Sequence, residues 1–95
     1  MLAMRSVTIR TPSDLAIIVS KNVRARRKKQ KISMARLAEI SGVSFGSIRR
    51  FEETGEISLK SLLKIAIVLD CADEFEHLFK QTEPTSIQEI IDGNL

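Results

Sequence analysis

Two adjacent arginines, Arg49 and Arg50, are the residues of this chain best suited to a specific chemical task. A guanidinium group presents a planar fork of N–H donors, which matches the O6 and N7 acceptors of guanine in the DNA major groove. Such a bidentate contact discriminates against a wrong base by about 1 to 3 kcal/mol. The same fork also suits a phosphate, so either arginine could contact the DNA backbone alone. The element that carries them decides which task is open to them.

The stretch from residue 33 to residue 52 predicts two short helices joined by a tight turn. Ser33 and Ser44 can each cap the N-terminus of a helix, and Gly42 and Gly55 can adopt the left-handed conformation that ends one. The inward positions follow helical spacing; they are Leu37, Ala38, Ser41, Ile48 and Phe51. This order is typical of a helix-turn-helix, whose second helix lies in the major groove. The alternative is an ordinary αα-hairpin that binds no ligand.

These residues resemble the Xre/Cro-type helix-turn-helix regulators, a family that includes many phage repressors and antitoxins. The resemblance rests on Leu37-Ala38, Gly42-Val43-Ser44, Ile48 and Glu52, and it extends from about Pro12 to Phe79. The order Thr-Pro-Ser-Asp-Leu, a long basic helix and then the motif is similar to HipB-type proteins. The resemblance implies an all-α, five-helix, lambda-repressor-like domain that dimerises on a palindromic operator in double-stranded DNA.

The second helix of the motif is expected to read bases with Phe45, Gly46, Arg49 and Arg50. Phe45 could touch a thymine methyl group, or it could fold back onto the turn as a hydrophobic staple. Phosphates are expected at helix N-termini, with side-chain help; the candidate side chains are those of Ser33, Arg36, Ser44, Ser47 and Lys60. The family commonly has a glutamine at the position of Met34, and methionine cannot replace its hydrogen bond to a phosphate.

Arg27 lies where the inward stripe of the first helix should continue after Val23. The family resemblance implies that this arginine forms an ion pair with Glu52, which would tie the first helix to the end of the recognition helix. Loss of one partner would then leave a partly buried charge unpaired. The alternative is that Arg27 is one more solvated base in a basic helix.

The basic residues are concentrated in the first part of the chain. Residues 1–69 carry 14 Lys and Arg against 5 Asp and Glu, whereas residues 70–95 carry 1 against 7. Seven basic residues and no acidic one lie between Lys21 and Lys31. Such a run can be a solvated helix face, but beside a helix-turn-helix it indicates a surface for phosphates. The acidic end is expected to face away from DNA.

The composition argues against several other classes of function. No apolar run approaches the roughly 20 residues of a membrane span, and the N-terminus lacks the apolar region of a signal peptide. The single cysteine, Cys71, permits no intrachain disulfide and fits a reducing cytoplasm. His77 has no second histidine or cysteine nearby to hold a metal. Without a Gly-rich phosphate loop or paired carboxylates in an apolar setting, we expect neither catalysis nor a cofactor.

Apolar spacing divides the chain into an N-terminal arm (1–11), a five-helix DNA-binding domain (12–80) and a tail (81–95). The tail is a candidate for a dimer contact or a partner contact through Ile87, Ile90 and Ile91. Residues 6–10 alternate and are expected to be extended, and residues 85–88 resemble a capping box for a short tail helix. The first helix is expected over 12–29 and the fifth over 72–80. The predicted apolar face of the first helix contains Leu15, Ile18, Val19, Asn22 and Val23; that of the fourth, capped by Ser58, contains Leu59, Leu62, Leu63, Ala66 and Leu69.

A symmetric homodimer is expected, because one recognition helix covers too few base pairs for useful specificity. The fifth helix offers Phe75, Leu78 and Phe79, and the extended arm offers Val7 and Ile9 with unpaired strand edges. An alternative is a monomer with frayed ends. Two functions fit these features: a dimeric transcriptional repressor, or an antitoxin that neutralises a HipA-like toxin and regulates its own operon.

Overall fold

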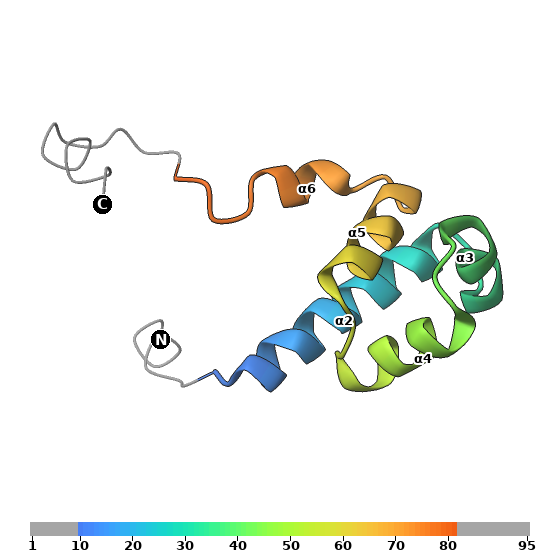
Figure 1. Cartoon of the computed structure of the whole chain (residues 1–95), viewed down its shortest axis with the longest axis horizontal. Helices are drawn as coiled ribbons and strands as arrows, with labels where there is room; N and C mark the ends of the chain where they lie inside the picture. Colours follow the sequence, from blue (N-terminus) through green and yellow to red (C-terminus); the bar gives the residue numbers. More distant parts are fainter. Residues whose placement is uncertain (1–9, 82–95) are drawn as a thin grey trace, which may run out of the picture.

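The computed structural model describes residues 10–81 of the 95-residue chain, and these residues form five α-helices and no strand. In order, the helices are α2 (Pro12–Lys29), α3 (Met34–Ser41), α4 (Phe45–Thr54), α5 (Leu59–Val68) and α6 (Ala72–Glu76). Figure 1 shows α2 running obliquely across the molecule, with α3 near its C-terminal end and α4 alongside it. The all-α, five-helix, lambda-repressor-like fold expected from the sequence is confirmed. The expected extended arm and the tail helix lie outside the described residues.

The helix boundaries follow from local hydrogen bonds that the sequence predicted. Thr11 and Asp14 form a complete capping box: the Thr11 hydroxyl accepts from the Asp14 amide at 3.0 Å, and the Asp14 carboxylate accepts from the Thr11 amide at 3.2 Å. Ser33, Ser44 and Ser58 each accept a hydrogen bond from the amide three residues later. These caps satisfy amides that would otherwise have no partner at a helix start.

The hydrophobic core lies where α3, α4 and α5 meet. The most deeply buried apolar side chains come from all three of these helices and their connections; they are Leu37, Val43, Ile48, Phe51, Ile65, Ala66 and Leu69. Backbone contacts join α3 to both α4 and α5, and α2 packs along α4. The turn between α3 and α4 is therefore fixed from within, and the outer face of α4 is left open.

The apolar faces predicted for α2 and α5 are only partly covered. Leu15, Ile18 and Val19 are 40 to 46% exposed, and Leu59 is 64% exposed. Among the described residues, the backbone of α2 approaches α4 but not α5 or α6. The buried positions of α2 are instead Ser20, whose hydroxyl donates to the Ile17 carbonyl at 2.8 Å, and Arg27. The apolar stripe is present, but of the five residues predicted for it only Val23 packs against the core.

The fifth helix is shorter than expected. The spacing of its apolar residues predicted a helix to Lys80, whereas α6 ends at Glu76. Its first residue follows Cys71, whose side chain makes no capping hydrogen bond, and Phe79 has a left-handed φ of 62° that no α-helix accommodates. None of the helices that the structure describes is long and apolar enough to cross a membrane.

Candidate nucleic-acid interface

Helix α4 has one buried face and one open face. Ile48 and Phe51 are at most 1% exposed and hold the helix on the core. The four residues predicted to read bases are all exposed on its other sides; they are Phe45, Gly46, Arg49 and Arg50. A side chain at Gly46 would meet no atom within 4 Å. This open face therefore offers two guanidinium groups and one aromatic ring to a partner, with no steric obstruction at Gly46.

Both arginines of this face are paired with carboxylates of the same chain. Arg49 Nε donates to Glu53 Oε2 at 3.1 Å, one helical turn away, and Arg50 Nη2 donates to Glu56 Oε1 just after the helix. All four side chains are more than 60% exposed, so each pair is worth no more than about 1 kcal/mol. The arginines can thus exchange these partners for DNA acceptors at small cost.

The residues predicted to contact phosphates are divided between two places. Ser33, Arg36 and Ser44 line one shallow hollow between the start of α3 and the start of α4. The Ser44 hydroxyl donates to Ser47 Oγ at 2.8 Å, which places Ser47 beside the same hollow. Lys60 lies apart from them, exposed in the first turn of α5. The amides at the start of α3 add the positive end of a helix dipole to the hollow.

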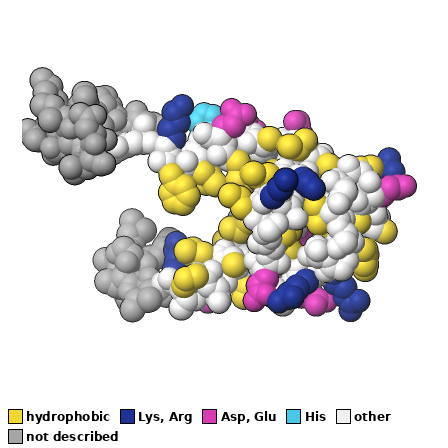
Figure 2. All heavy atoms as spheres, viewed as in Figure 1, with side chains coloured by type: hydrophobic (Ala, Val, Ile, Leu, Met, Phe, Trp, Pro, Cys, Tyr) yellow, Lys and Arg dark blue, Asp and Glu magenta, His cyan; other side chains and the backbone are white. Residues whose placement is uncertain are grey.

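Arg36 is not a free charge in this hollow, because its Nη1 donates to Glu39 Oε1 at 2.7 Å. Figure 2 shows the same pattern at several places on the molecule, with Lys and Arg side chains lying next to Asp and Glu side chains.

Residues 10–81 contain no group of three or more His, Cys, Asp or Glu side chains placed to hold a metal ion.

Arg27 and Glu52 form a buried ion pair between α2 and α4. Arg27 donates from Nε to Glu52 Oε2 at 2.7 Å and from Nη2 to Oε1 at 2.9 Å, and the two side chains are 8% and 6% exposed. Its Nη1 donates to the carbonyl of Ile32, just before α3, at 2.8 Å. One guanidinium thus joins the long helix, the entry to the motif and the end of α4.

Sequence reasoning missed the carboxylates that hold the two exposed arginines. The spacing of Arg49 and Glu53, four residues apart on one helix, is a signal that could have found the first pair. The pair of Arg50 and Glu56 has no such signal, because it depends on the left-handed turn at Gly55 that brings the chain back beside α4. A third missed pair joins Arg26 to Glu74 across 48 residues, with Nη1 and Oε2 2.5 Å apart.

Comparison with known proteins agrees with this geometry. A helix-turn-helix family model, HTH_3, matches residues 23–75, which is more than half of the chain and contains α3, α4 and α5 in full. No curated protein matches the chain. The matched region includes both capped helices of the motif, the glycine turn between them and the pair of Arg27 and Glu52. The chain therefore belongs to the Xre/lambda-repressor-like helix-turn-helix family of DNA-binding transcriptional regulators.

Proposed function

We propose that this protein is a dimeric transcriptional repressor that occupies a palindromic operator and reads each half-site with α4. The observation that carries the proposal is the contrast between the two faces of α4. Its inner face is fixed by Ile48, Phe51 and the buried pair of Arg27 and Glu52, whereas its outer face presents Arg49 and Arg50 unobstructed. A rigid helix with an open basic face fits the major groove.

In this proposal the two arginines read guanine edges, and the ring of Phe45, which is 45% exposed, touches a thymine methyl group. Gly46 contributes close approach of the helix backbone rather than a side chain. The hollow lined by Ser33, Arg36 and Ser44, together with Ser47, holds a phosphate at one edge of the groove. Lys60 holds another phosphate by charge alone, at the start of α5.

The dimer in this proposal is built by the chain around α6, because the reading face of α4 must stay free. Leu78 and Phe79 are 53% and 102% exposed, and Phe75 is half-buried beside them. Val7 and Ile9 would add a pairing edge from the arm, which lies outside the described residues. A twofold dimer places two recognition helices on half-sites about 34 Å apart.

The test is a DNA selection from a random pool with the purified full chain, followed by affinity measurements on the selected operator. Arg49→Ala or Arg50→Ala should weaken operator binding more than binding to random duplex, because base contacts supply only the specific part. Lys60→Ala should weaken both alike and make the affinity less dependent on salt. A wild-type protein that binds no duplex at low salt would overturn the proposal.

A second candidate function is that of an antitoxin, and the HipB-like order of Thr11-Pro12-Ser13-Asp14-Leu15 before a basic helix favours it. In this function the chain would bind and neutralise a HipA-like toxin while repressing its own operon. Co-expression with the product of the adjacent gene tests it. Growth arrest by that product, relieved by this chain and also by its Arg49→Ala variant, would support the antitoxin function independently of operator reading.

A further inference from the structure

An open apolar groove of about 360 Å³ lies between α2 on one side and α5 and α6 on the other. Its walls are mainly aliphatic and aromatic; they include Val19 and Val23 from α2, Leu59 and Leu62 from α5, and Phe75 and Leu78 from the α6 region. In Figure 2 hydrophobic side chains line both sides of the gap that opens between these elements. The helices that build the core do not close over this face.

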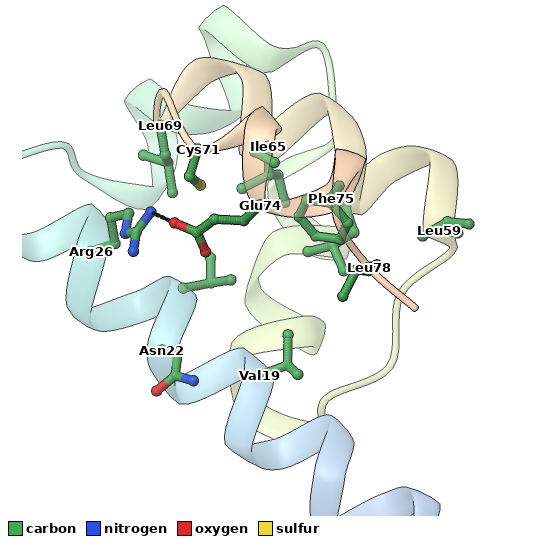
Figure 3. Close-up of a pocket in the computed structure, with 13 residues that line it drawn as sticks. Val19, Asn22, Arg26, Leu59, Ile65, Leu69, Cys71, Glu74, Phe75 and Leu78 are labelled. Atoms are coloured by element: carbon green, nitrogen blue, oxygen red, sulfur yellow. Dashed lines mark hydrogen bonds and ion pairs between the residues drawn. The ribbon is translucent and has the colours of Figure 1, made fainter. Parts of the chain in front are cut away.

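The groove has one polar end. Figure 3 shows Arg26 and Glu74 joined there, and it shows Leu59 and Leu78 toward the other end. The pair of Arg26 and Glu74 is the one hydrogen bond between α2 and α6 side chains in the described residues. A polar rim beside an apolar centre is the usual arrangement of a protein–protein interface.

The apolar walls are too exposed for the interior of a monomer. Val19 is 40% exposed, Leu78 is 53% exposed and Leu59 is 64% exposed. Single exposed apolar residues are ordinary, but a contiguous set around a groove indicates a contact surface. The groove is also large enough for aromatic side chains, because an apolar cavity of about 150 Å³ holds a benzene molecule.

Phe79 supplies, on the same molecule, an aromatic side chain of the kind that an apolar groove can hold. Its exposed fraction is 102%, so the ring contacts almost nothing in its own chain, and it does not line the groove. Its φ of 62° is unusual for a bulky residue and turns the chain sharply after α6. Leu78, the residue before Phe79, does line the groove. Phe79 thus lies next to the groove of its own chain but outside it.

We propose that the groove is filled by Phe79 of a second copy of this chain, and that the exchange is reciprocal. An isologous dimer requires that each molecule carry both members of a contact, since residue i of one copy meets residue j of the other and the reverse. Each copy carries both members of this contact, because it has Phe79 and also the groove. This inference rests on the proposed dimer and assigns a receiving surface on α2 and α5 that the dimer proposal did not contain.

The position of the groove on the molecule is compatible with a second copy as its occupant. Residues 10 and 81, where the described chain begins and ends, lie on the same side of the molecule, at the open end of the gap between α2 and α6 (Figure 1). The motif formed by α3 and α4 lies on the other side. A partner docked at the open end would therefore leave the reading face of both copies free.

The decisive experiment measures the dimer dissociation constant of the full chain by sedimentation equilibrium for three variants. Phe79→Ser removes the inserted ring, and Val19→Glu places a charge in the receiving wall. Each should raise the dissociation constant by about 100-fold or more, because two symmetric contacts are lost at once. Ile67→Ser is the matched control: Ile67 is 67% exposed on α5 but does not line the groove, so its dimer should match the wild type.

A mixture of the two disruptive variants gives a sharper test. The Val19→Glu copy retains Phe79, and the Phe79→Ser copy retains an intact groove, so one of the two contacts can form between them. The mixture should therefore dimerise more tightly than either variant alone. A dimer of Phe79→Ser as tight as the wild type, a monomeric wild type at tens of micromolar, or a mixture that gains nothing would each overturn the inference.

Other occupants of the groove give different results. If residues of the same chain cover it, Val19→Glu should lower the thermal stability of a monomer and leave the dissociation constant unchanged, which contradicts the inference. Failure of the proposed DNA function is separable from all of these outcomes. Phe79→Ser leaves the α4 face intact, so the variant as well as the wild type should bind random duplex at low salt. If neither binds, the DNA proposal fails while the sedimentation result stands.

Discussion

A Cβ atom on Gly55 would lie 2.8 Å from the carbonyl carbon of Ala16 and 2.9 Å from its Cβ. Gly55 is buried, ends α4 with a φ of 84°, and sits directly against α2. Two requirements thus meet at one residue: a left-handed backbone and the absence of a side chain. Gly42 ends α3 with a similar φ of 79°, but a Cβ there would meet no atom within 4 Å.

The first prediction compares alanine at these two positions. Gly42→Ala should lower the free energy of unfolding by about 1 to 2 kcal/mol, the penalty of a left-handed non-glycine residue. Gly55→Ala should lower it by about 1 to 3 kcal/mol more, since overlap with Ala16 forces α2 and α4 apart. Urea denaturation followed by circular dichroism measures both. Equal losses would show that the close approach of Gly55 to Ala16 carries no strain.

The second prediction concerns the buried pair of α2 and α4. Glu52→Gln should lower the free energy of unfolding by about 3 to 5 kcal/mol, because Arg27 then stays buried without its counter-ion. Arg27→Met should cost somewhat less, because Arg24 Nε lies 4.0 Å from Glu52 Oε1 and remains near the carboxylate. The double variant Arg27→Met with Glu52→Gln should lose less than the sum of the two single losses, since neither member of the pair is then left as an unpaired buried charge. Additive losses in denaturant titrations would contradict direct coupling of these two side chains.

The third prediction uses the open space at Gly46. Gly46→Ala should raise the free energy of unfolding by about 0.5 to 1 kcal/mol, because alanine favours the helix and its methyl group meets nothing in the free protein. The melting temperature, measured by circular dichroism, should rise accordingly. A lower melting temperature would indicate that the first turn of α4 cannot accept a side chain.

The fourth prediction concerns the carboxylates that pair with the exposed arginines. Glu53→Gln or Glu56→Gln should each tighten binding to duplex DNA by about 1.4- to fivefold, since the competing surface pair is worth about 0.2 to 1 kcal/mol. Titrations of labelled duplex at low salt give these affinities. Glu76→Gln on α6 makes the same change of net charge away from α4 and is the matched control. An equal gain from Glu76→Gln would assign the effect to overall charge.

The sequence predicted the local features of the fold well. The caps at Thr11, Ser33 and Ser44 and the left-handed glycines are decided within four or five residues, so the pattern alone identifies them. The exposure of Val19 and Leu59 could not be predicted in this way. Helical spacing identifies an apolar face, but whether another element covers that face depends on packing between distant segments.

The candidate site likewise has features that local spacing predicts and features that it does not. The open positions of α4 follow from the burial of Ile48 and Phe51 three residues apart, which helical geometry dictates. The partners of the exposed arginines are less predictable. Glu56 reaches Arg50 because the chain reverses at Gly55. The sequence predicts the left-handed glycine, but it does not predict which side chain the residues after the glycine will meet.

The division of α4 into a buried face and an open face also allows its DNA preference to change independently of the fold. The side chains that would choose a base sequence at Phe45, Gly46, Arg49 and Arg50 contribute little to the core, and those that hold the helix in place do not reach the open face. Under the proposed function, new side chains at these four positions would change the preferred operator without altering the scaffold. A lineage could diversify its targets by a few substitutions, and an engineer could transplant another recognition sequence onto the same frame.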